Sequence, residues 1–211
     1  MPINKNNFEK SVFINCPFDD KYLPILEAIA FTVLRCGGEP KLARLEADAN
    51  EIRLNKIIRL MEESRLGIHD LSRTKLDRGT KTPRFNMPFE LGLDMACRQW
   101  SKHPHHKSKR ILILASSQFE YQKFLSDISG QDIHAHGDDP IEAIRGVRDF
   151  LNMNKPGKNK LPYPGPKTIG RDLAKFRAAL PMMLKTIPMH KRDLTMVDYI
   201  ALASEWIVVN C

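Results

Sequence analysis

Short apolar runs alternate with amphipathic stretches along the first two thirds of this chain. Two stretches, at residues 22–36 and 51–64, carry apolar side chains at helical spacing. The apolar runs have the length and composition of buried strands, and they are SVFIN at 11–15, RLGIHDLS at 65–72 and RILILA at 110–115. Strands that alternate with helices predict an α/β fold, with a flavodoxin-like parallel sheet and helices on both faces.

Outside these stretches the alternation of apolar and polar residues is less regular, and toward the C-terminus it predicts helices. Residues 40–46 predict a second strand, and residues 122–136 predict a short helix and an edge strand. Three later amphipathic stretches predict helices, at 140–151, 168–185 and 194–208. We therefore expect an α/β domain at residues 1–140 and a helical extension at 141–211, which acts as a cap or an oligomerisation element.

The helix predicted at residues 84–98 (RFNMPFELGLDMACR) carries the carboxylate of most interest. Asn86 is a suitable N-cap, and Pro88 fits the first turn. One face, expected to be buried, is formed by Phe89, Leu93, Ala96 and Trp100, with Gly92 allowing close packing. Glu90 lies off that face, near the positive end of the helix dipole, and is expected to stay ionised. It is either a nucleophile or transition-state stabiliser, or an ordinary first-turn acid.

Ligands of parallel α/β sheets bind beyond the carboxyl ends of the strands. Polar and turn residues follow each predicted strand, and others open the helix of Glu90. The residues expected to form one cleft are Asn15, Cys16, Pro17, Phe18, Asp70, Ser72, Asn86, Glu90, Ser116 and Ser117. His69 is more simply a structural histidine of its strand, and Cys16 a small apolar filler.

Composition limits the classes of function. The 211 residues carry a net charge of +8, and many of the basic residues lie in loop-like stretches. Basic loops suit a phosphate-bearing small ligand as well as nucleic acid. We favour the small ligand, because the sequence contains no nucleic-acid-binding motif. Apolar runs are too short to cross a membrane, and the N-terminus does not resemble a signal peptide, so we expect a cytoplasmic protein. Four scattered cysteines predict free thiols and no metal site, and the histidines at 103–106 predict a solvated loop.

Four blocks of the chain, taken together, resemble a known family. They are VFINCPFDDKY, RLGIHDLS, FNMPFELGLDMA and RILILASSQFEYQKFLSDISGQDIHAHG. In this order they resemble the nucleoside 2-deoxyribosyltransferase-like and TIR-like nucleotide-binding domains of bacteria. The resemblance covers about residues 11–137, and its most specific part is the pattern from Asn86 to Gly92, in which an Asn is followed by Glu-Leu-Gly.

The resemblance implies cleavage of an N-glycosidic bond, with Glu90 as the essential carboxylate. In the transferases this Glu attacks the sugar, and in TIR-type enzymes that cleave NAD it stabilises or traps the ribosyl centre. Asp70 would hold a sugar hydroxyl or assist proton transfer, with Asp94 in support. Where many transferases place an aromatic residue against the sugar, this chain has Phe89 and Phe13, neither with a hydroxyl.

Leaving-group chemistry favours NAD. Nicotinamide leaves a cationic ring as a neutral molecule, so a single ionised Glu suffices, whereas a nucleoside generally needs a proton donor as well. Basic residues suited to the pyrophosphate are Arg44, Arg73, Lys75 and Arg78. The first expectation is an NAD glycohydrolase or cyclase with NAD as substrate and no cofactor, forming a homo-oligomer and acting in antiphage defence with a partner protein. The alternatives are a nucleoside or nucleotide N-glycosidase or deoxyribosyltransferase, and a non-catalytic module that binds a nucleotide signal.

Overall fold

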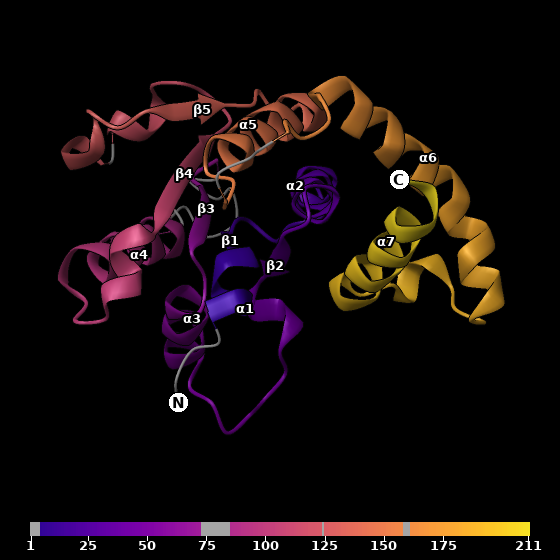
Figure 1. The fold of residues 1–211 in the computed structure, drawn as a ribbon, viewed down its shortest axis with the longest axis horizontal. Coiled ribbons are helices and arrows are strands. Elements are labelled where there is room, and N and C mark those ends of the chain that lie inside the picture. Colours follow the sequence, from indigo (N-terminus) through magenta and orange to yellow (C-terminus); the bar gives the residue numbers. More distant parts are fainter. Residues whose placement is uncertain (1–4, 73–84, 124, 158–160) are drawn as a thin grey trace.

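A parallel sheet forms the centre of the protein, and its strand order is β2-β1-β3-β4-β5 (Figure 1). The computed structural model describes residues 5–72, 85–123, 125–157 and 161–211. The strands are β1 (Ser11–Asn15), β2 (Glu39–Lys41), β3 (Leu66–Asp70), β4 (Arg110–Ala115) and β5 (Ile133–Ala135), and every neighbouring pair is parallel. This is the order of flavodoxin-like folds, so the predicted α/β class is confirmed.

Helices cover both faces of the sheet. One face carries α2 (Leu23–Arg35) and α5 (Pro140–Met153), and the other carries α3 (Arg53–Glu62) and α4 (Asn86–Trp100). Side chains alternate along β1, so that Val12 and Ile14 join the core beneath α2 and α5, while Phe13 packs with Ile57 and Leu60 of α3. Both faces of β1 are therefore buried, which explains its continuous apolar sequence.

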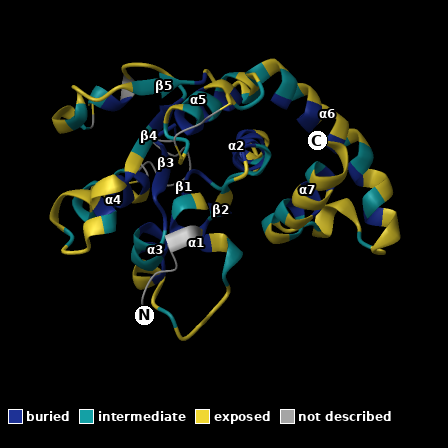
Figure 2. Ribbon diagram, viewed as in Figure 1, coloured by how far each residue is buried: buried dark blue, intermediate teal, exposed yellow. Residues whose placement is uncertain are grey.

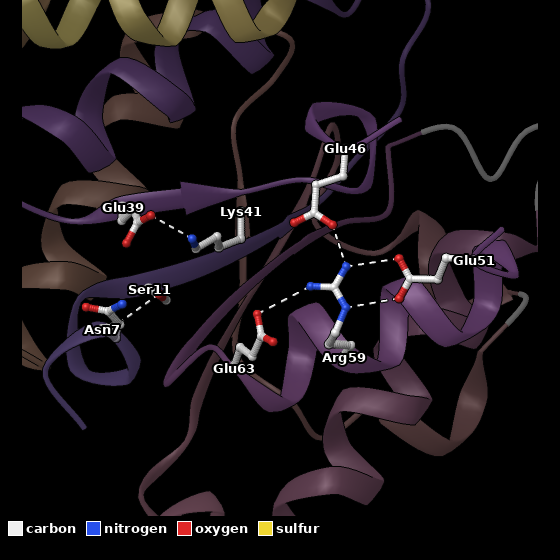
Figure 3. Close-up of polar contacts among 8 residues, drawn as sticks. All are labelled: Asn7, Ser11, Glu39, Lys41, Glu46, Glu51, Arg59 and Glu63. Atoms are coloured by element: carbon white, nitrogen blue, oxygen red, sulfur yellow. Dashed lines mark hydrogen bonds and ion pairs between the residues drawn. The ribbon is translucent and has the colours of Figure 1, made fainter. Parts of the chain in front are cut away.

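The connection between β2 and α3 differs from the prediction. The strand expected at 40–46 ends at Lys41, and a 3₁₀ turn, η1 (Ala43–Leu45), follows. Helix α3 begins after Ile52, without a side-chain cap from Asp48 or Asn50. Polar contacts hold this connection: Arg59 of α3 contacts Glu46, pairs with Glu51 at 3.0 Å and approaches Glu63 at 3.5 Å (Figure 3). A helix that was not predicted, α1 (Lys5–Lys10), precedes β1.

The predicted C-terminal helices are present as α6 (Pro166–Thr186) and α7 (Met196–Asn210), and they pack against α2 (Figure 1). Phe176 of α6 is the centre of this contact, since its ring lies 5.7 Å from Phe31, 5.4 Å from Tyr199 and 6.0 Å from Trp206, measured between centroids. These residues belong to the same core as β1 and α5. The boundary expected at residue 140 falls at the start of α5, which covers the sheet with α2.

Burial corrects the predicted orientation of α4. The face expected to be buried is largely exposed, with Phe89 at 55% and Trp100 at 79% exposed, whereas Met87, Glu90, Leu91 and Asp94 are buried. Figure 2 shows the buried positions in the strands and α2 and the exposed ones on the outer sides of α4, α6 and α7. Within the described ranges, no helix combines the length and apolarity needed to span a bilayer.

Candidate functional site

The strand order places the candidate site between the ends of β1 and β3. β1 and β3 are neighbours in the sheet, and the helices that follow them, α2 and α4, lie on opposite faces. Such a switch point is where open α/β sheets bind ligands. Asn15 is the last residue of β1, and Asp70 is the last residue of β3. β4 and β5 bring Ser116 and His136 to the same edge. The His136 N–H donates to the Ala115 carbonyl, and the Gly137 N–H donates to the Ser116 carbonyl.

Asp70 is completely buried and accepts three hydrogen bonds. The Tyr22 hydroxyl donates to Oδ2 at 2.5 Å, His136 Nε2 lies 3.0 Å from the same oxygen, and the Ser72 backbone N–H donates to Oδ1 at 2.8 Å. Burial disfavours the charged form, but these donors outweigh it and hold the pKa of Asp70 below its usual range. Asp70 is thus an ionised carboxylate whose oxygens are already occupied by protein donors.

His136 is held in one tautomer by a tight turn. The backbone N–H of Asp138 donates to His136 Nδ1 at 3.0 Å, so the ring proton sits on Nε2, facing Asp70 and Ser72 Oγ, which lies at 2.9 Å. Gly137 and Asp138 both have left-handed φ angles, +59° and +58°, and this is uncommon for an Asp. The turn therefore costs conformational energy, and the histidine that it positions is buried beside the switch point.

A second buried network links β1, β3, α4 and Lys109, the residue immediately before β4. Nδ2 of Asn15 donates to the Met87 carbonyl at 3.1 Å and lies 3.1 Å from His69 Nδ1. Since the Met87 oxygen can only accept, the Asn15 atom is the amide nitrogen and His69 Nδ1 is the acceptor. Nε2 of His69 then donates to Asp94 at 3.0 Å, and Lys109 pairs with the other Asp94 oxygen at 3.0 Å.

This network determines which face of α4 meets the sheet. Asp94 and Lys109 are both fully buried, and the bonds from His69 and Lys109 outweigh the cost of burial and lower the pKa of Asp94. Gly67 in β3 makes room for the carboxylate, because a Cβ atom there would collide with Asp94 Oδ2. Close packing therefore depends on Gly67, and not on Gly92 as expected, since Gly92 has nothing near its Cβ position.

Glu90 lies one turn before Asp94 on the same buried face and is 7% exposed. Burial raises its pKa, and the charge of Arg53 only partly offsets this, so burial opposes the ionised form that the helix N-terminus was expected to favour. No donor among the described residues forms a hydrogen bond to it. Glu90 therefore has free acceptor capacity within the described part of the site, unlike Asp70.

Cys16 connects Glu90 with the other charges. It is fully buried, and its pKa is raised by burial and then by the charges of Asp70 and Glu90. Cys16 is thus a small buried residue, and the raised pKa disfavours the thiolate that a nucleophile needs. Both carboxyl groups act electrostatically on this thiol, and the convergence of the predicted cleft residues stays a prediction.

The other predicted site residues differ in accessibility. Pro17 and Ser72 are buried, Phe18 and Ser116 are half-buried, and Asn86, Phe89 and Ser117 are exposed. Asn86 is the first residue of α4 and not its cap, because Phe85 occupies the N-cap position without a side-chain hydrogen bond. Arg73, Lys75 and Arg78, expected to bind a pyrophosphate, lie outside the described residues.

Sequence reasoning missed Tyr22 and His136 as partners of Asp70. Tyr22 closes the CPFDDKY segment as the N-cap residue of α2, and His136 directly follows β5. The position of His136 after a strand was an available signal, whereas Tyr22 lies seven residues beyond the end of β1 and carried none.

The solvated loop expected at the histidines 103–106 is only partly present. His103 is exposed and precedes the 3₁₀ turn η2 (Pro104–Ser108), and His105 is half-buried within that turn. His106 is fully buried, and its Nε2 lies 3.0 Å from the Glu62 carbonyl, so the expectation is wrong for this residue. In the described part of the chain, no cluster of His, Cys, Asp and Glu has an arrangement able to hold a metal ion.

Comparison with known proteins does not identify the chain. No family model, no curated protein and no solved structure matches it. The resemblance to TIR-like and deoxyribosyltransferase-like domains therefore stays a prediction. A function is proposed below from the geometry at the β1/β3 switch point.

Proposed function

We propose that this protein is a TIR-like enzyme that cleaves the nicotinamide N-glycosidic bond of NAD, as a glycohydrolase or cyclase. The observation that carries the proposal is the placement of Glu90. A buried carboxyl without a hydrogen-bond donor among the described residues lies at the start of a helix beside the switch point of a flavodoxin-like sheet. Ligands of such sheets bind in that crevice.

Charge complementarity favours a cationic substrate. The raised pKa of Glu90 means that burial makes its ionisation less favourable than that of an exposed glutamate. A pyridinium ring beside Glu90 would lower that pKa, because an opposite charge favours the carboxylate. Binding of NAD would thus favour the ionised form that the reaction uses.

The reaction needs no proton donor. The bond between the ribose C1′ and the nicotinamide nitrogen breaks, its electron pair goes to the pyridine ring, and neutral nicotinamide leaves. The Glu90 carboxylate stabilises or traps the positive ribosyl centre. Water then completes hydrolysis, or a nucleophile within the same molecule completes cyclisation.

Asp70 has a positioning role in this proposal. Its oxygens accept from Tyr22, His136 and Ser72, so it fixes the end of β3 relative to the start of α2 and the end of β5. The Asn15 amide does the same for α4 through the Met87 carbonyl. Together they hold the crevice open beside Glu90, which is the kind of preorganisation that catalysis requires.

The raised pKa of Glu90 also favours a second candidate, a nucleoside or nucleotide N-glycosidase or deoxyribosyltransferase. A carboxyl whose pKa is raised by burial holds its proton more tightly and is better suited to donate it to a departing base, as the acid of a glycosidase does. In this alternative Glu90 works in its neutral form. The pH dependence of the reaction therefore distinguishes the two candidates.

The test is incubation of the purified full-length chain with NAD, followed by measurement of free nicotinamide. We expect release by the wild type and by Glu205→Gln, an exposed glutamate of α7, and a loss of at least about 10³-fold in Glu90→Gln. A concentration series tests the proposed homo-oligomer, and a panel of nucleoside monophosphates tests the second candidate. Full activity in Glu90→Gln would refute both. Tight NAD binding without turnover would indicate a nucleotide-sensing module.

Activity in bacterial defence with a partner protein is part of the proposal, and it rests on the resemblance alone. The experiment is infection of cells that carry the wild-type or Glu90→Gln gene. Protection by both proteins would show that defence does not use this reaction.

A further inference from the structure

A cavity of about 470 Å³ lies between the turn after β1, the turn after β2 and the C-terminal helices. Its walls include Phe18 and Asp19 from the first turn, Arg44 from η1, and Lys191 and Val197 from the segment that leads into α7. Both turns follow the carboxyl ends of their strands, so the cavity opens at the same edge of the sheet as Glu90. Its volume suits a small organic ligand.

The cavity and the candidate active site share a wall. Cys16, Pro17 and Phe18 are consecutive in the turn after β1. The charges that act on the buried Cys16 thiol include those of Asp70 and Glu90 and also those of Arg44 and Asp19, which line the cavity. A ligand long enough to pass over this turn would reach both sites.

The lining combines apolar and charged side chains, and the charged ones are Asp19, Asp20, Glu27, Arg44 and Lys191. Apolar side chains from three elements form one part of it, namely Leu23, Leu26, Leu180, Leu194, Met196 and Val197. The Arg44 guanidinium lies 5.1 Å above the Phe18 ring, a cation–π arrangement that leaves one edge of the guanidinium for a phosphate. Among the described residues, neither Arg44 nor Lys191 forms an ion pair with a carboxylate.

We propose that this cavity binds the distal nucleoside monophosphate of a dinucleotide whose other half lies at Glu90. This inference rests on the proposed function for the position of the reacting ribose. The base lies against the apolar wall, and Arg44 and Lys191 contact the phosphate. The C-terminal helices then have a specific role, since they supply the wall that makes a dinucleotide a better substrate than a mononucleotide.

The test measures binding separately from turnover. AMP and ADP-ribose are titrated by calorimetry into the wild type, Arg44→Ala, Lys191→Ala and Val197→Trp. We expect each substitution to weaken binding about tenfold or more, because a charge-assisted contact or the cavity space is lost. The matched controls are Arg192→Ala, next to Lys191 but outside the lining, and Val208→Trp, at the far end of α7. Val197 is 48% exposed, so a Trp there leaves the core intact.

The outcomes separate this inference from the proposed function. Failure of AMP and ADP-ribose to bind the wild type, or binding that the three cavity variants leave unchanged, overturns the cavity assignment even if nicotinamide is released. Binding that depends on Arg44 and Lys191 sustains it, even if no nicotinamide is released and the proposed reaction is wrong. With an active enzyme, Val197→Trp should raise KM for NAD and leave that for nicotinamide mononucleotide unchanged.

Discussion

The side-chain amide of Asn15 donates to the backbone carbonyl of Met87 across 3.1 Å, and so ties the end of β1 to the first turn of α4. Glu90 follows in the next turn, on the buried face of the same helix. The amide nitrogen also lies 3.1 Å from His69 Nδ1, so both neighbours of this nitrogen are acceptors. The position of the candidate catalytic carboxyl thus depends on an amide at residue 15.

Asn15→Asp should destabilise the protein, although the two side chains have almost the same shape. The change replaces two N–H donors with a carboxylate that faces the Met87 carbonyl and His69. We expect a loss of about 2–3 kcal/mol in the free energy of unfolding, because buried acceptors are left without donors. Urea unfolding at pH 7 measures it, with Asn55→Asp on the exposed side of α3 as the control. Equal stability of the two variants would mean that the Asn15 contacts contribute nothing.

Glu90→Gln should stabilise the protein at neutral pH. Burial raises the pKa of Glu90 above its usual value of 4.5, so the folded state binds the proton more tightly than the unfolded state. The stability of the wild type relative to Glu90→Gln therefore falls as pH rises from 4.5 through the raised pKa. We expect Glu90→Gln to be the more stable protein at pH 7, with the difference shrinking as pH falls toward 4.5. Thermal unfolding across this range measures the difference, and a variant less stable at pH 7 would contradict it.

The rate of nicotinamide release should rise with pH and then level off. NAD cleavage uses ionised Glu90, and the raised pKa moves the rising limb above the ordinary range of a glutamate. The measurement is kcat/KM for NAD between pH 4 and pH 9. A rate that falls across the same limb would indicate that Glu90 acts as an acid, as the second candidate requires.

Tyr22→Phe should make the protein more sensitive to acid. Asp70 has a lowered pKa in the folded state, so its contribution to stability is present above its unfolded pKa and is lost as pH falls through the folded value. Without the Tyr22 donor that folded pKa rises, and we expect a loss of about 1–2 kcal/mol at pH 7 and acid unfolding at a higher pH. Circular dichroism during acid titration follows this. Tyr121→Phe is the control, because Tyr121 is buried but its hydroxyl contacts only Gln122 among the bonds described.

Lys109→Met should be among the most destabilising single substitutions in this chain. Its ammonium group pairs with buried Asp94 at 3.0 Å and also donates to the Met61 carbonyl at 2.6 Å. Removing one partner of a buried pair leaves the other charge uncompensated, and the expected cost is about 3–5 kcal/mol. Urea unfolding compares it with Lys107→Met, an exposed neighbour. The double variant Asp94→Asn with Lys109→Met should recover part of the loss, and no recovery would show that Lys109 acts through its carbonyl contacts alone.

Local sequence patterns were sufficient to predict the class of fold and to identify the strands whose ends carry polar residues. Runs such as SVFIN and RILILA become buried strands because a short β-branched segment between turn residues has few alternatives. Once the strands are parallel, their carboxyl ends share one edge, so Asn15, Asp70 and Ser116 had to lie there. The sequence by itself therefore determined the α/β layers and the general location of the site.

Only the tertiary structure decided how α4 is rotated and which groups surround Asp70. Periodicity favoured Phe89 and Trp100 as the buried face, but the pairing of Asp94 with His69 and Lys109 buries the polar face instead. Tyr22 and His136 meet Asp70 across 48 and 66 residues of sequence. The local sequence around one of these residues does not indicate which distant residue it will contact. A buried polar network stabilises the fold only when its members are paired, and that pairing is set by the tertiary structure.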